Sequence, residues 1–164
     1  MNSSTESTPQ LRPGDLAPDF ELPQQNGSVV RLKELLERGP VVVYFYPRDE
    51  TLGCTAQACA FRDAYEEFKS AGAEVVGISS DSTDSHASFA NHRKLPFLLL
   101  SDADGEVRKR FRVKPAFFGL APGRVTFLIE PSGIIRHTFS SAINMARHVS
   151  ETLGVLRQLD GARA

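Results

Sequence analysis

The stretch that most constrains the fold is residues 41–46, in which every side chain is β-branched or aromatic. A run without polar–apolar alternation is typical of a strand buried on both faces of a parallel sheet. A loop follows at residues 47–53, and beyond it apolar residues recur in steps of three and four: Ala58, Phe61, Tyr65 and Phe68. This spacing predicts an amphipathic helix that ends near Gly72. A buried strand that leads through a short loop into a helix indicates an α/β protein.

The remaining sequence alternates between strand and helix patterns. Further strands are expected at 19–22, 28–32, 74–78, 97–100 and 125–129, the last paired as a hairpin with 134–139. Further helices are expected at 33–38, from a cap at Ser82 or Asp84 to about 92, at 106–111 and at 145–159. This order predicts a mixed central β-sheet flanked by helices, an α/β arrangement that resembles the thioredoxin fold.

Length and charge limit the classes of protein to which the chain can belong. Its 164 residues suit a single domain, which we place at 13–160 behind a polar tail at 1–12 that we expect to be disordered. The near balance of 19 basic and 20 acidic side chains argues against a nucleic-acid partner. The longest apolar runs are far shorter than the ~20 residues of a membrane span. Without a recognisable targeting segment, we expect a cytoplasmic protein, with a mature plastid protein as the alternative.

The two cysteines, Cys54 and Cys59, lie in one short segment, so a disulfide between them would close almost no loop and add little stability. Their importance would therefore be chemical. Cys54 stands where the loop enters the helix, and the unpaired N–H groups of a helix N-terminus favour a thiolate over a thiol. Thr51 adds a hydroxyl three residues before the sulfur. A cation would complete a site for nucleophilic sulfur, but the spacing alone does not identify one.

The five-residue spacing of the cysteines has a mechanical consequence. In an intact α-helix, residues i and i+5 are separated by roughly 8.6 Å at Cα and by about 140° around the axis. A disulfide tolerates a Cα separation of at most ~7 Å. Cys54 and Cys59 therefore cannot bond while the helix is whole, and we expect its first turns to unwind whenever such a bond forms.

The segment around Cys54 resembles the active-site signature of the peroxiredoxins. Pro47, Thr51 and Cys54 form the pattern P-x3-T-x2-C, and a second cysteine five residues later is typical of the peroxiredoxin Q branch, also called bacterioferritin comigratory proteins. The similarity extends over residues 12–159 and is greatest to the plant and cyanobacterial form. Its other motifs lie at 57–63, 73–79, 95–102 and 122–127. One departure is Leu52, where many members of the family have proline.

The resemblance implies a thiol-specific peroxidase. By that resemblance Cys54 is the peroxidatic cysteine, Cys59 is the resolving cysteine, Thr51 holds the peroxide oxygen, Arg124 is the cation, and Pro47 shields the thiolate from water. Hydrogen peroxide or an alkyl hydroperoxide would oxidise Cys54 to a sulfenic acid, which Cys59 converts to a disulfide. Thioredoxin or a similar dithiol would then reduce this disulfide. The resemblance implies no metal, flavin or haem, and it implies a monomer.

Two other functions remain open from the residues alone. A general thiol–disulfide oxidoreductase has neighbouring chemistry, but the Cys-x-x-Cys pattern is absent. A zinc-binding or redox-sensing module could use Cys54, Cys59, His86 and His92. However, residues 60–85 separate the two pairs, where ~12 residues are usual.

Three further groups of residues have a structural interpretation beside a functional one. The first group is a run of basic residues, which we expect on a solvated helix face and which could also dock an acidic partner: Arg108, Lys109, Arg110, Arg112 and Lys114. A hydrophobic substrate collar is open for five aromatic residues, and core packing explains the first three, in the predicted strand, equally well: Tyr44, Phe45, Tyr46, Phe117 and Phe118. The surface is expected for two histidines that have no partner pattern: His137 and His148.

Overall fold

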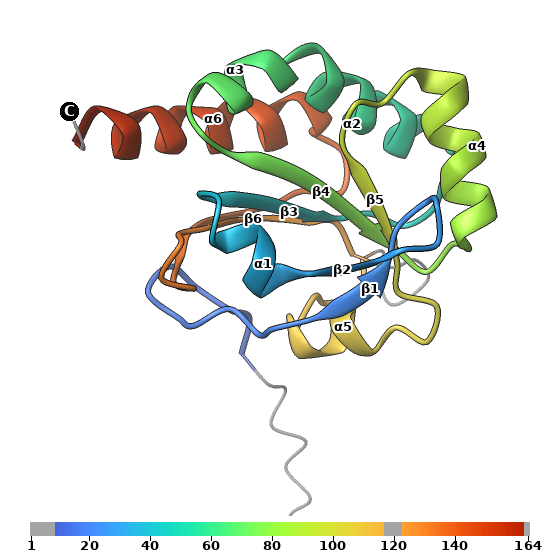
Figure 1. Ribbon diagram of the computed structural model, residues 1–164, viewed down its shortest axis with the longest axis horizontal. Coiled ribbons are helices and arrows are strands. Elements are labelled where there is room, and N and C mark those ends of the chain that lie inside the picture. The colour runs from blue at the N-terminus through green and yellow to red at the C-terminus, as the bar shows by residue number, and fades with distance from the viewer. Residues whose placement is uncertain (1–8, 117–122, 163–164) are drawn as a thin grey trace, which may run out of the picture.

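A computed structural model describes residues 9–116 and 123–162, and its centre is a five-stranded mixed sheet with the order β5-β4-β3-β6-β7 (Figure 1). The strands are β3 (Val41–Phe45), β4 (Glu74–Ser79), β5 (Leu98–Ser101), β6 (Val125–Ile129) and β7 (Ile135–Ser140). β3, β4 and β5 are mutually parallel, whereas β6 is antiparallel to β3 and β7 is antiparallel to β6. The expected mixed sheet and the expected β6–β7 hairpin are therefore confirmed.

Helices and a small second sheet cover the two faces of the central sheet. The helices are α1 (Leu32–Leu36), α2 (Leu52–Asp63), α3 (Tyr65–Ser70), α4 (Thr83–Arg93), α5 (Glu106–Arg110) and α6 (Met145–Ala162). The second sheet pairs β1 (Glu21–Pro23) with β2 (Val29–Arg31) in antiparallel fashion. In Figure 1, α2, α3 and α6 lie above the central sheet, and α1, α5 and the β1–β2 sheet lie below it.

The central strand β3 is apolar throughout because both of its faces are covered. Val41, Val43 and Phe45 belong to a core cluster that includes buried residues of α1, α5, β1 and β2. Val42 and Tyr44 belong to a second cluster that includes buried residues of α2, α3, α4 and α6. Alternate side chains of one strand thus enter two separate cores, which explains the absence of polar alternation in this run.

The helix expected to continue from the Cys54 loop to Gly72 is two helices in the structure. α2 ends at Asp63, and Ala64 (φ −98°, ψ 2°) separates it from α3. Phe61 and Phe68 lie on either side of this break and are both fully buried. The apolar spacing was correct, but it did not reveal the break, because both helices place their apolar residues in the same core.

The segment before β1 contacts the rest of the domain. Residues 1–8 of the predicted tail lie outside the described residues, but Leu11 is buried and belongs to the cluster beneath the sheet. Gly14 N–H donates to the carbonyl of Ile135 at 2.8 Å, which ties this segment to β7. These contacts anchor residues 11–14, and the bounds of the domain at 13–160 stay a prediction.

The remaining helices agree closely with the sequence pattern. Ser82, rather than Asp84, caps α4, since its hydroxyl accepts the N–H of Ser85 at 3.1 Å. α6 starts at the expected Met145 and extends to Ala162, and its apolar residues Val149, Leu153 and Leu156 are buried. Among the helices of the described ranges, none is long and apolar enough to cross a lipid bilayer.

Candidate active site

Cys54 lies in the first turn of α2, directly after the loop that leaves the end of β3. The helix begins after Thr51, whose backbone is extended (φ −76°, ψ 156°) and whose carbonyl accepts the N–H of Thr55 at 2.8 Å. Cys54 is only 1% exposed, and it faces the core together with Ala58 and Phe61. The apolar face of α2 therefore places the sulfur in a nearly dry environment at a helix N-terminus.

Two hydrogen-bond donors from different segments reach the sulfur. The backbone N–H of Arg48 lies 3.5 Å from Cys54 Sγ, and Nη2 of Arg124 lies 3.4 Å from it. Arg124 stands immediately before β6 and is 7% exposed, so its charge is largely shielded from water. Both donors favour negative charge on the sulfur, because hydrogen bonds to an ionised group are stronger than those to a neutral one.

Gln57 orients the guanidinium group of Arg124. It is fully buried one turn after Cys54, and its Oε1 accepts a hydrogen bond from Nη1 of Arg124. A Cβ atom at Gly53 would lie 3.2 Å from Arg124 Nη2, so glycine leaves room for the close approach. The sequence patterns assigned no role to Gln57, although a polar residue on the apolar face of the helix, three positions after the cysteine, is a usable signal.

Unpaired donors remain beside the sulfur. Within the described residues, Nε2 of Gln57 and Nε of Arg124 are buried without a hydrogen-bond partner. Buried polar atoms without partners are rare in native proteins and often mark a site that a ligand completes. Both atoms belong to the Arg124–Gln57 pair, whose arginine contacts Cys54 through Nη2.

The other residues expected at the site are placed less directly. Thr51 is exposed, and its hydroxyl donates to the carbonyl of Arg48 at 2.9 Å rather than to the sulfur. Pro47 is half-buried at the start of the same loop. Cys59 lies farther along α2, is partly exposed, and has a free thiol, as does Cys54. The structure thus brings Arg124 to Cys54, but it leaves Cys59 apart from it on an intact helix.

Arg108 departs from the solvated helix face expected for the basic run. Its guanidinium donates to the carbonyls of Tyr46 and Gly123, each at 2.7 Å, and lies over the ring of Phe45. Burial lowers the pKa of this guanidinium. Arg108 thereby joins the end of β3, next to Pro47, to the residue just before Arg124. The other four basic residues of the run are exposed as expected: Lys109, Arg110, Arg112 and Lys114.

The histidines of the proposed zinc site have other partners. Both ring nitrogens of His86 are engaged, Nδ1 with Asp49 at 2.7 Å and Nε2 with the Leu100 carbonyl at 3.0 Å, and His92 pairs at the surface with Glu50 at 3.0 Å. Among the described residues, the group that could hold a metal ion is Asp49, Asp81 and His86, which contains neither cysteine. The Cys2His2 zinc alternative therefore has no support in the structure.

The surface position expected for His137 and His148 is wrong. His148 is fully buried on α6, where Nδ1 accepts from Thr126 Oγ1 and Nε2 donates to the Ser141 carbonyl, each at 2.8 Å. Burial is the largest effect that lowers its pKa, to about 4. His137 is half-buried on β7, and burial lowers its pKa as well. Neither histidine had a sequence pattern that distinguished a buried position from an exposed one.

The aromatic residues considered for a substrate collar divide into two groups. Tyr44, Phe45 and Tyr46 are almost completely buried, and they fill the cores above and below the sheet. Phe117 and Phe118 lie outside the described residues. For the strand residues, the structure supports the packing interpretation rather than the collar.

A cysteine at a helix N-terminus, contacted by an arginine in a thioredoxin-like α/β fold, defines the protein as a thiol peroxidase. The chain belongs to the AhpC/TSA family, whose sequence model matches residues 13–138. This membership confirms the resemblance to the peroxiredoxins that the sequence motifs indicated.

Individual relatives point to the peroxiredoxin Q branch. The chain is 50% identical over 146 residues to chloroplastic peroxiredoxin Q of Sedum lineare, covering 89% of this chain and 78% of that protein. It is 49% identical over 148 residues to the Arabidopsis thaliana protein of the same name, covering 90% and 68%. The crystal structure of peroxidoxin BcpB from Mycobacterium tuberculosis superposes with a TM-score of 0.85 at 41% identity, covering 92% of this chain and 99% of that one. The bacterioferritin comigratory protein of Xanthomonas campestris gives 0.78 at 30% identity, covering 86% and 92%.

Proposed function

We propose that Cys54 is the sulfur through which this thiol peroxidase reduces hydrogen peroxide and alkyl hydroperoxides. The observation that supports this role is the contact between Cys54 Sγ and Nη2 of Arg124 at 3.4 Å, with the Arg48 N–H on the same sulfur. Alkyl peroxide reduction is named as an activity of the Xanthomonas campestris relative. We therefore propose that Cys54 reacts with hydrogen peroxide and with alkyl hydroperoxides by the same chemistry.

In the proposed first step, the Cys54 thiolate attacks one peroxide oxygen and the O–O bond breaks. The sulfur is oxidised to a sulfenic acid, and the second oxygen leaves with a proton as water or an alcohol. Arg124 stabilises the negative charge that moves from the sulfur onto the leaving oxygen. Thr51 turns its hydroxyl from the Arg48 carbonyl to the bound peroxide, and Pro47 keeps water from the sulfur.

In the proposed second step, the thiol of Cys59 condenses with the sulfenic acid and releases water. The disulfide requires the first turns of α2 to unwind, because the two residues lie on one intact helix and both thiols are free. Hydrogen exchange should show lower protection of residues 54–62 in the oxidised protein than in the reduced one, and no such change in Cys59→Ser. Equal protection in both redox states would exclude unwinding.

A dithiol protein such as thioredoxin completes the proposed cycle by reducing the Cys54–Cys59 disulfide. Peroxide consumption coupled to thioredoxin and its reductase tests the assignment. Cys54→Ser should abolish peroxide-dependent turnover, whereas Cys59→Ser should retain one round of oxidation and lose continuous cycling. Normal turnover by Cys59→Ser would show that Cys59 is not the resolving cysteine. Disulfide exchange without peroxide consumption would instead favour a general thiol–disulfide oxidoreductase.

We also propose that the protein acts as a monomer, since this chain alone supplies both cysteines and Arg124. Light scattering during size-exclusion chromatography should give a mass near 18.0 kDa in both redox states.

The plant relatives are named as chloroplastic proteins, which supports the plastid alternative. The cytoplasmic expectation has no support from those names, and cell fractionation with an antibody against the chain decides between the two compartments.

A further inference from the structure

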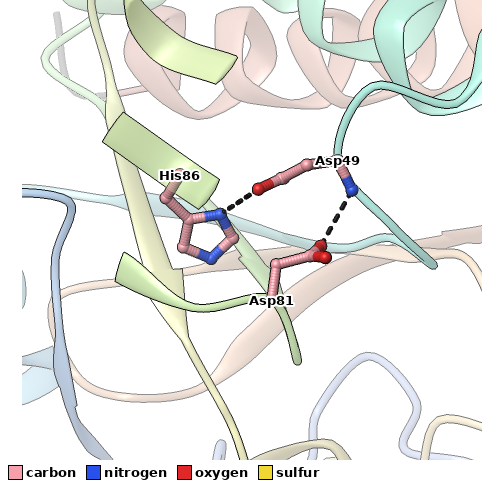
Figure 2. Close-up of side chains that lie close together, drawn as sticks. All are labelled: Asp49, Asp81 and His86. Carbon is pink, nitrogen blue, oxygen red and sulfur yellow. Dashed lines mark hydrogen bonds and ion pairs between the residues drawn. The ribbon is translucent and has the colours of Figure 1, made fainter. Parts of the chain in front are cut away.

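A buried cluster on the side of α4 holds the loop that carries the Arg48 N–H. Asp49 follows Arg48 in the loop and is 6% exposed, and His86 on α4 is completely buried. Figure 2 shows the carboxylate of Asp49 directed at the ring of His86, with Oδ2 and Nδ1 2.7 Å apart. On the other side of the ring, Nε2 lies 3.0 Å from the carbonyl of Leu100 in β5.

The partners of this pair require a proton between its two residues. The Leu100 carbonyl and a carboxylate can each only accept a hydrogen bond, whereas a neutral imidazole ring carries one hydrogen, on Nε2 or on Nδ1. In either tautomer of a neutral His86, one ring nitrogen would face an acceptor oxygen with lone pairs only, at 2.7 Å for Asp49 or 3.0 Å for Leu100, which is repulsive. One further proton, carried by Nδ1 or by Asp49, removes this conflict.

The other contacts of Asp49 also indicate a proton rather than a metal ion. Its Oδ1 accepts from the hydroxyl of Tyr46 at 2.6 Å, and its Oδ2 accepts from Ser85 Oγ at 2.8 Å. Burial and neighbouring charges raise the pKa of Tyr46 well above its ordinary value, so this hydroxyl remains a donor. Hydrogen-bond donors thus occupy both carboxylate oxygens, one from Tyr46 directly after β3 and one from Ser85 in α4.

The same loop residues determine where the Arg48 N–H points. The N–H of Asp49 donates to Asp81 Oδ2 at 2.8 Å, and the carbonyl of the Arg48–Asp49 peptide accepts from Thr51 Oγ1 at 2.9 Å. The N–H on the other side of Arg48 lies 3.5 Å from Cys54 Sγ. Asp49 is thus held by its side chain at His86 and by its N–H at Asp81, one residue away from the donor on the sulfur.

We propose that Asp49 and His86 form a proton-sharing clasp that positions the Arg48 N–H on Cys54. His86 is then a positioning residue for the peroxide step, although it does not touch the sulfur. The inference rests on the proposed role of Cys54. The pattern P-x3-T-x2-C does not include this pair. The hydrogen-bonded Asp49 carboxylate and His86 imidazole would fix the loop without touching the sulfur.

Two substitutions of His86 separate its two hydrogen bonds. The side-chain amide of His86→Asn can donate to Asp49 in place of Nδ1, whereas that of His86→Gln reaches toward the Leu100 carbonyl in place of Nε2. In a Cys59→Ser background, stopped-flow measurement gives the rate constant for Cys54 oxidation by hydrogen peroxide. We expect His86→Gln to lower it about tenfold or more and His86→Asn to stay within about threefold. The thiolate absorbance at 240 nm and neutral pH should fall in His86→Gln and recover in His86→Asn.

Two results separate the failure of this inference from the failure of the proposed function. If folded His86→Gln reacts at the parent rate with unchanged thiolate absorbance, the clasp does not position the sulfur and only this inference fails. If the Cys59→Ser parent itself shows no oxidation of Cys54 by peroxide, the proposed function fails as well.

A second pair of variants and a measurement without any substitution cover the case in which the His86 variants do not fold. Asp49→Asn can still bond to a neutral His86 ring and should keep most of the rate, whereas Asp49→Ala should lose it. Equal rates in these two variants would overturn the proposal.

In the unmodified protein, ¹⁵N-edited NMR should show a hydrogen shared between His86 Nδ1 and Asp49. A bare Nδ1, or a stoichiometric metal ion in the purified protein, would contradict the clasp.

Discussion

At the scale of single residues, the guanidinium group of Arg124 lies 3.4 Å from the sulfur of Cys54. It contacts Cys54 directly, Gln57 holds its other terminal nitrogen, and both neighbours are buried. Arg124→Ala should therefore slow oxidation of Cys54 by peroxide about 10²-fold, by analogy with the loss of an oxyanion donor. Stopped-flow oxidation kinetics measure this, with Arg112→Ala at an exposed position as the matched control. A rate for Arg124→Ala equal to that of the control would exclude a catalytic role for this guanidinium.

His148 gives the stability of the protein a dependence on pH. Its pKa is lowered from 6.5 to about 4 by burial, so the unfolded chain binds a proton in a range where the folded protein does not. The free energy of unfolding should therefore fall as the pH drops from about 6.5 toward 4, by at most about 3 kcal/mol from this residue. Urea unfolding across that range measures the effect, and the slope should be smaller in His148→Gln. An identical slope in the variant would show that other groups cause it.

The residues of the site differ in how far the sequence revealed them. Cys54 and Arg124 were predicted because they lie in motifs of the family. Gln57 lies in such a motif without an assigned role, and Arg108 was expected on a solvated helix face, since their contacts cross the fold: Gln57 meets a residue 67 positions away, and Arg108 meets the carbonyl of Tyr46, 62 positions away. His148 was misplaced because a buried histidine and an exposed one have the same sequence pattern when their partners are distant.

At the scale of elements, the start of α2 is where this chain departs from its family. Leu52 occupies the first helical position, 94% exposed, after the extended residue Thr51. Proline suits this position, because its fixed φ is helical and the first N–H of a helix has no internal partner. An extended preceding residue is also what proline requires.

Leu52→Pro should consequently stabilise the protein by about 0.4–1 kcal/mol, chiefly by restricting the unfolded chain. The urea midpoint of the reduced protein measures this change, and Leu52→Ala is the control for loss of the exposed side chain. A midpoint for Leu52→Pro at or below that of Leu52→Ala would contradict the geometry described for this helix start.

The secondary structure was more predictable than its interruptions. The spacing of Phe61 and Phe68 correctly indicated helix, but the turn at Ala64 that separates α2 from α3 has no proline or glycine to announce it. After that turn, the hydroxyl of Tyr65 reaches the carboxylate of Glu74 on β4 at 3.0 Å. A contact of this kind forms only in the folded molecule, so local sequence cannot reveal the break that accompanies it.

At the scale of the whole molecule, the sheet assembles the site from distant segments. β3 and β6 are neighbours in antiparallel register, with Phe45 opposite Val125. The loop after β3 leads to Cys54 in the first turn of α2, and Arg124 directly precedes Val125, so the pairing of β3 with β6 brings the segments that carry the two residues to the same edge of the sheet. The sequence predicted these strands from their apolar runs, but it could not predict their pairing order, which set the arginine beside the sulfur.

The proposed function requires that peroxide oxidises the sulfur of Cys54. Mass spectrometry of the reduced Cys59→Ser protein, after addition of an equimolar amount of hydrogen peroxide and a sulfenic-acid trap, tests it directly. We predict one trapped adduct, located on Cys54, with complete loss of the added peroxide. An unmodified Cys54 in the presence of remaining peroxide would contradict the account.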